Sequence, residues 1–158
     1  MGKILVAYFS ASGETERLAG TIASALKADI QEIRPAVPYS DADLNWNNEK
    51  SRSTVEMKDR SCRPEMASPV DVSGYDMVLV GFPIWWGEAP RIIETFLESG
   101  DFSGKTVVPF ATSGGSGMGR TADILKKSVP DAAVRNGRVM NSRDSAKAVL
   151  RWADSLGI

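Results

Sequence analysis

Residues 4–16 read ILVAYFSASGETE, and this stretch decides what kind of fold the chain can form. Its first six residues are apolar without interruption, which is typical of a strand buried on both faces of a sheet. Beyond it, Leu18 and Ile22 repeat at helical spacing. The stretch therefore predicts a buried strand that passes through a short polar loop into a helix.

The loop between this strand and this helix is rich in hydroxyl groups and contains a glycine. Backbone amides that open a helix carry partial positive charge, and glycine lets a ligand approach the backbone closely. We therefore expect an anion such as phosphate to bind on Ser10, Ala11, Ser12, Gly13, Glu14 and Thr15. A simple helix cap by one of the hydroxyls is the alternative interpretation.

The remaining apolar patterns alternate between strand and helix. Buried strands are predicted at residues 4–9, 77–82 and 107–111, with weaker strands at residues 29–34 and 134–139. Helices are predicted from residue 14 onward and at residues 90–100, 117–127 and 142–156. This alternation predicts an α/β fold, doubly wound, with a five-stranded parallel sheet and helices on both faces.

Two features interrupt this pattern. Pro109 cannot donate a ladder hydrogen bond, so we expect an irregularity or a shorter strand there. Residues 35–69 are rich in Pro, Asn, Ser and charge and stand where a connecting helix would normally lie. We still expect residues 1–158 to form one domain with an irregular segment at residues 35–69.

The composition excludes several classes of function. The 158 residues include no histidine and one cysteine, Cys62, so no Ser-His-Asp catalysis, no thiolate zinc site and no CxxC pair is expected. The formal net charge of −1 gives no basic stripe for nucleic acid. The apolar run at residues 4–9 is too short for a membrane span and no signal-peptide cleavage region follows it, so we expect a cytoplasmic protein. We also expect it to be a monomer.

Two further loops follow the predicted second and third buried strands. The first contains Pro83, Ile84, Trp85, Trp86 and Gly87. The second contains Thr112, Ser113, Gly114, Gly115, Ser116 and Gly117. Adjacent indoles beside a glycine at the end of a strand suit a flat aromatic ligand. Core aromatics and an ordinary flexible loop are the alternative interpretations.

The three loops, taken in order, resemble those of the flavodoxin family, and residues 83–87 (PIWWG) resemble one branch of it. The resemblance implies the strand order 2-1-3-4-5 and FMN as a noncovalent cofactor. Its phosphate would lie on residues 10–15 and its ring between residues 83–87 and 112–117. The implied function is electron transfer between protein redox partners, a reductase and an acceptor, with no catalytic side chain.

Two other functions remain open at this point. An FMN-dependent NAD(P)H:quinone-type reductase would need a second pocket beside the ring, which residues 35–69 could build. A binding module that has lost its cofactor would keep the fold alone. The three loops lack Lys, Arg and His, so we expect a low reduction potential for a bound flavin.

Overall fold

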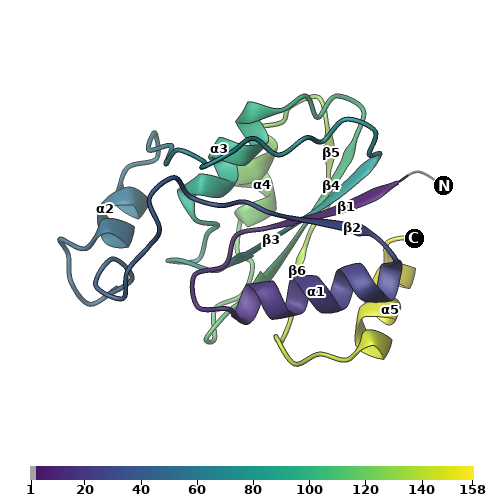
Figure 1. The fold of residues 1–158 in the computed structure, drawn as a ribbon, viewed down its shortest axis with the longest axis horizontal. Helices are drawn as coiled ribbons and strands as arrows, with labels where there is room; N and C mark the ends of the chain where they lie inside the picture. Colours follow the sequence, from purple (N-terminus) through teal and green to yellow (C-terminus); the bar gives the residue numbers. More distant parts are fainter. Residues whose placement is uncertain (1–2) are drawn as a thin grey trace.

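The computed structural model describes residues 3–158, a parallel sheet with helices on both faces (Figure 1). The strands are β1 (Ile4–Tyr8), β2 (Asp29–Glu32), β3 (Met77–Pro83), β4 (Thr106–Thr112), β5 (Ala133–Val134) and β6 (Arg138–Val139). The helices are α1 (Glu14–Leu26), α2 (Arg52–Lys58), α3 (Arg91–Ser99), α4 (Thr121–Lys126) and α5 (Ala146–Ser155). The strand order is β2-β1-β3-β4-β5, with β6 also paired to β4. The predicted fold class and strand order are confirmed.

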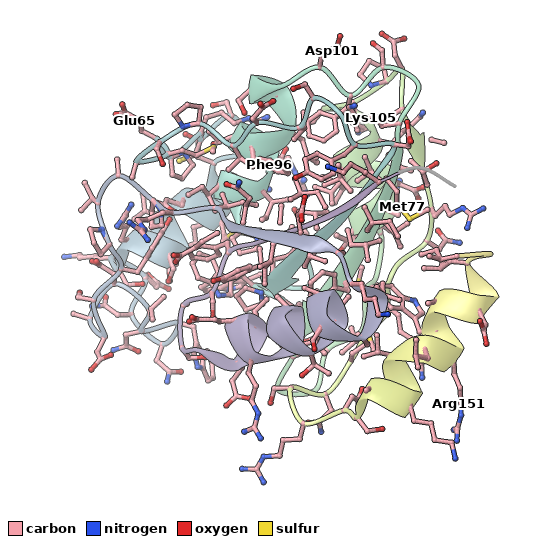
Figure 2. The ribbon with its side chains drawn as sticks, turned by 45° about the vertical axis from the view of Figure 1, so that its right-hand side comes forward. Glu65, Met77, Phe96, Asp101, Lys105 and Arg151 are labelled. Atoms are coloured by element: carbon pink, nitrogen blue, oxygen red, sulfur yellow. The ribbon has the colours of Figure 1, made fainter. Side chains whose placement is uncertain are left out.

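Each central strand buries its side chains alternately on the two faces. Val78, Val80 and Phe82 of β3 lie in the layer formed with α3 and α4, whereas Leu79 lies in the layer formed with α1 and α5. Phe96 of α3, labelled in Figure 2, is fully buried in the first of these layers. Burial on both faces explains why the central strands read as continuous apolar runs.

The predicted fifth strand is divided into β5 and β6, and Pro109 explains the division. The amide of Arg135 donates to the Val107 carbonyl (2.9 Å) and the amide of Met140 to the Ala111 carbonyl (2.7 Å). Pro109 lies midway between these two acceptors, so its missing N–H faces the gap between β5 and β6. β4 itself continues from Thr106 to Thr112. The expected irregularity therefore falls in the neighbouring strand and β4 is not shortened.

Gly137 lies in this gap against the backbone of Pro109. A Cβ at position 137 would lie 1.9 Å from the Pro109 carbonyl oxygen. We predict that Gly137→Ala lowers the free energy of unfolding, measured with urea, by about 1–3 kcal/mol or more, because the two backbones must separate. Gly20→Ala in α1 is the control, since nothing lies within 4 Å of a Cβ there. Gly20→Ala should raise the free energy of unfolding by about 0.5–1 kcal/mol. Equal effects of the two substitutions would contradict the prediction.

The segment at residues 35–69 contains α2, which the sequence analysis did not predict. The helix has seven residues, and its Val55 is exposed, so it carries no apolar stripe. The Ser51 side chain caps it by accepting a hydrogen bond from the Thr54 amide. An antiparallel bridge between Pro35 and Met66 brings the two ends of the segment together. Figure 1 shows α2 beyond the ends of the strands rather than over a face of the sheet.

Two predicted helices begin later than expected. α4 starts at Thr121 because Gly119 adopts a left-handed conformation with φ of 53°. α5 starts at Ala146, after Ser145 caps it by accepting from the Ala148 amide at 3.2 Å. Over residues 3–158, none of the helices combines the length and the apolar composition that crossing a bilayer requires.

Candidate functional site

Two adjoining cavities lie at the edge of the sheet where β1, β3, β4 and β6 end. The tryptophan cavity, of about 480 Å³, is lined by Leu44, Trp46, Ser53, Ile84, Trp85, Trp86, Ser113, Gly114, Gly115 and Ser116. The helix-end cavity, of about 410 Å³, is lined by Ser12, Glu14, Pro83, Ile84, Trp85, Thr112, Ser113, Gly114, Met140, Asn141 and Ser142. Because four residues line both, the two cavities can hold different parts of one ligand.

The loop before α1 leaves backbone donors free at the helix-end cavity. The Ser10 hydroxyl accepts hydrogen bonds from the amides of Gly13 (3.1 Å) and Glu16 (3.2 Å), which fixes the loop against the helix. Gly13 adopts φ of 93°, a conformation that favours glycine. Within residues 3–158, no acceptor pairs with the following amides: Ala11, Ser12, Glu14 and Thr15. Free amides at the positive end of a helix are suited to an anion.

The hydroxyl groups of this loop have different surroundings. Thr15 is buried, and its hydroxyl lies 2.7 Å from that of Thr112, which joins α1 to the end of β4. The Ser10 hydroxyl bonds amides of its own loop and of the first turn of α1, while the N-cap position is occupied by Gly13, which has no side chain to cap the helix. Ser12 is exposed and is the hydroxyl of this loop that lines a cavity. Any anion bound at this loop would therefore be held mainly by amides.

The loop after β3 is a two-residue hairpin turn that presents an indole. The Trp85 amide donates to the Glu88 carbonyl (2.9 Å), and the Glu88 amide donates back to the Trp85 carbonyl (3.0 Å). The two central residues, Trp86 and Gly87, have φ of 51° and 75°, as a type I′ turn requires. Gly87 therefore shapes the turn and lines neither of the two cavities.

The two indoles of this loop differ in their environment. Trp85 packs edge-on against Phe9 and Tyr39, with ring centroids 5.7 Å and 5.4 Å away. Trp86 is 49% exposed, although its left-handed backbone is unfavourable for a large side chain. Trp85 is thus a fixed wall shared by both cavities, and Trp86 covers the tryptophan cavity from the outside.

The loop after β4 forms the polar side of the tryptophan cavity. The Gly115 amide donates to the Ser113 hydroxyl at 3.1 Å, which orders the turn. Elsewhere in the described chain, nothing accepts a hydrogen bond from the amides of Gly114 and Ser116. Gly117, the last predicted residue of this loop, does not line either cavity. The loop therefore offers free donors beside the indoles.

The electrostatics of the site are those of an acidic or neutral surface. Glu14 is the one charged side chain lining the two cavities, and its carboxylate accepts a hydrogen bond from the Ser142 hydroxyl. Arg91 is 1% exposed, and its guanidinium is paired with Glu88 (3.0 Å) and Glu94 (3.1 Å). The charge of a bound anion would be met by amide hydrogen bonds and by no cationic side chain.

The segment at residues 35–69 forms one side of the tryptophan cavity and is joined to the rest of the protein by polar contacts. The Arg91 guanidinium donates to the carbonyls of Glu56 (3.4 Å) and Met57 (2.7 Å) at the end of α2. Tyr39 donates to the Glu56 carboxylate at 2.5 Å, and the guanidinium of Arg52 lies 3.8 Å from the centre of the Tyr39 ring. Burial, and then the hydrogen bond to Glu56, raise the pKa of Tyr39, which keeps its hydroxyl protonated as a donor.

Sequence analysis missed six of the residues that line the cavities. They are Leu44, Trp46, Ser53, Met140, Asn141 and Ser142. The loop at residues 140–142 carries no recognisable motif and joins the site through the contact between Ser142 and Glu14. The first three lie in the irregular segment, where the tryptophan at position 46 was the signal available in the sequence; the structure shows its indole to be exposed.

The fold and the site together define a class of protein. It is a doubly wound parallel α/β protein with its cavities at the carboxyl ends of β1 and β3, where the strand order reverses. The sequence model of the flavodoxin family matches residues 3–156, and the chain belongs to this family. Flavodoxin is itself a standard example of a ligand site at such a reversal.

Solved structures of similar proteins agree with this assignment. A protein of Bacteroides eggerthii, provisionally described as a flavoprotein, is 50% identical with a TM-score of 0.95, over 100% of this chain and 99% of that chain. A protein of Bacteroides uniformis with the same description is 47% identical with a TM-score of 0.92, over 97% and 98%. A flavoprotein of Lactobacillus acidophilus in complex with FMN is 22% identical with a TM-score of 0.70, over 97% and 99%, and shares the fold.

The strain at Trp86 can be measured by comparing two substitutions that differ only in the Cβ. We predict that Trp86→Gly is more stable to urea than Trp86→Ala by about 1 kcal/mol, because alanine at positive φ is strained and glycine is not. Both variants lose the same indole contacts, so the difference isolates the backbone. At negative φ, an alanine variant is usually more stable than a glycine variant. If Trp86→Ala proved more stable than Trp86→Gly, the left-handed conformation at this position would be contradicted.

Proposed function

We propose that the chain binds FMN noncovalently in the two cavities and transfers electrons between a reductase and an acceptor protein. The observation that carries the proposal is the pairing of free amides at the start of α1 with indole walls in adjoining cavities. Cavities of this size are typical of small-molecule sites. The FMN complex of the Lactobacillus acidophilus flavoprotein, which has the same fold, supports FMN as the ligand.

The residues present fit the parts of such a cofactor. A phosphate in the helix-end cavity would be held by the amides of residues 11, 12, 14 and 15 and by the Ser12 hydroxyl. Trp85 and Trp86 would cover the faces of a flat ring in the tryptophan cavity, and the amides of Gly114 and Ser116 would face its polar edge. Bound flavin supplies the one- and two-electron chemistry that side chains cannot perform.

Flavin binding is tested with two ligands that differ by the phosphate. We expect the apoprotein to retain FMN through gel filtration, with perturbed visible absorption bands, and to bind riboflavin more weakly. Ser12→Asp should weaken FMN at least about tenfold and leave riboflavin affinity unchanged, because its carboxylate would lie beside the phosphate and away from the ring. Retention of neither flavin would contradict the proposal and favour a binding module without cofactor.

The reduction potential of the bound flavin tests the electrostatics of the site. Among residues 3–158, no Lys, Arg or His lines either cavity, so the negative charge added on reduction is poorly stabilised. We predict a midpoint potential below that of free FMN. Ser116→Lys should raise the potential of the one-electron couple that yields the reduced, anionic flavin by on the order of 20–70 mV, the effect of one charge at about 10 Å.

Ser103→Lys is the matched control for this measurement. Ser103 lies between Asp101 and Lys105, which Figure 2 places at the other end of the sheet, and it is exposed. The control should leave the potential within error of the wild type. A wild-type potential above that of free FMN would overturn the electrostatic argument.

A second candidate function is an FMN-dependent NAD(P)H:quinone-type reductase. The observation that favours it is the extension of the tryptophan cavity toward Leu44, Trp46 and Ser53 of the irregular segment. Steady-state oxidation of NADPH with a quinone separates the two functions. Turnover by the protein alone supports the reductase, whereas turnover only after adding a separate flavodoxin reductase supports the electron carrier.

A further inference from the structure

Ser53 of α2 borders the tryptophan cavity, and its buried hydroxyl has no hydrogen-bond partner among residues 3–158. Among the described residues 3–158, the Ser53 Oγ is the single buried side-chain oxygen or nitrogen that makes no hydrogen bond. Ser53 is 2% exposed and lines the tryptophan cavity. A buried hydroxyl without a partner lowers stability, so its presence in a folded protein requires an explanation.

The backbone that carries Ser53 is held at both ends of α2, so its side chain projects from a defined position. The Ser53 amide donates to the Asp43 carbonyl at 3.0 Å, which holds the start of α2 against the preceding turn. At the other end of the helix, Arg91 donates to the Met57 carbonyl at 2.7 Å. By contrast, the neighbouring Ser51 hydroxyl is paired, at 2.9 Å, with that of Thr54.

The surroundings of Ser53 in the cavity are apolar and aromatic. Leu44 and Trp46 come from the same irregular segment, and Trp85 and Trp86 from the turn after β3. In an apolar pocket, a single polar group fixes the orientation of a ligand by pairing with one polar atom of it. The chemistry required is therefore a flat, largely apolar ring that carries a hydrogen-bond acceptor.

We propose that the Ser53 hydroxyl donates a hydrogen bond to an acceptor atom, a carbonyl oxygen or a ring nitrogen, of the flavin ring system. This inference rests on the proposed flavin binding. It makes α2 part of the cofactor site and assigns a binding role to the irregular segment at residues 35–69, which would then hold the ring from a fourth direction.

The test compares stability with affinity in Ser53→Ala. The apoprotein variant should unfold at the same or a higher urea concentration than the wild type, because the hydroxyl it loses makes no bond within the protein. The affinity of Ser53→Ala for FMN should fall by about 2- to 15-fold, the effect of losing one hydrogen bond. Its affinity for riboflavin should fall by the same factor. The equal factor locates the lost contact at the ring, whereas Ser12→Asp affects FMN alone.

Ser51→Ala is the matched control, since it removes a paired hydroxyl from the same helix and should lower the unfolding midpoint. If Ser53→Ala fails to fold, Ser53→Cys replaces it, because a thiol keeps the shape and is a weaker donor. Unchanged affinity of Ser53→Ala for both flavins, with wild-type binding intact, overturns this inference and leaves the proposed function standing. Wild-type protein that binds neither flavin overturns both.

Discussion

The buried guanidinium of Arg91 is the interaction on which the geometry of the site depends. It contacts the Glu88 carboxylate in the turn after β3, Glu94 of α3, and two carbonyls at the end of α2. A cation without access to water is stable only when the groups around it compensate its charge and saturate its donors. The turn that carries Trp86 and the helix that carries Ser53 therefore cannot move independently. Two of the walls of the tryptophan cavity are thus positioned by a residue that lines neither cavity.

The parts of the fold that could be predicted from the sequence are those with a strong periodic signal. The central strands and α1 were predicted because two-sided burial and helical spacing leave plain patterns in the sequence. The division of the fifth strand was not located, because the effect of Pro109 falls on the neighbouring backbone. Likewise, α2 depends on a cap at Ser51 and on the hydrogen bond from Arg91 to its last turn. Neither contact produces a periodic pattern of apolar residues in the sequence.

The site shows the same distinction between local and tertiary signals. Hydroxyls, glycines and adjacent tryptophans in loops after buried strands were sufficient to predict three loops of the site. Which hydroxyls are free could not be predicted, because Ser10 bonds within its own loop while Thr15 bonds to a residue of another strand. The result is a site whose donors are mostly backbone amides. Such donors are fixed by the fold and vary little with the side chains, which explains how the site does without cations.

The hydrogen bond between Thr15 and Thr112 has a consequence for the thermodynamics of binding. It joins the helix that begins at the helix-end cavity to the strand that leads into the loop beside the tryptophan cavity. The two ends of a ligand spanning both cavities would thus meet loops that are already connected. Ordering a loop on binding costs conformational entropy, and that cost is met here during folding. The protein is preorganised, so its contacts can contribute more fully to affinity.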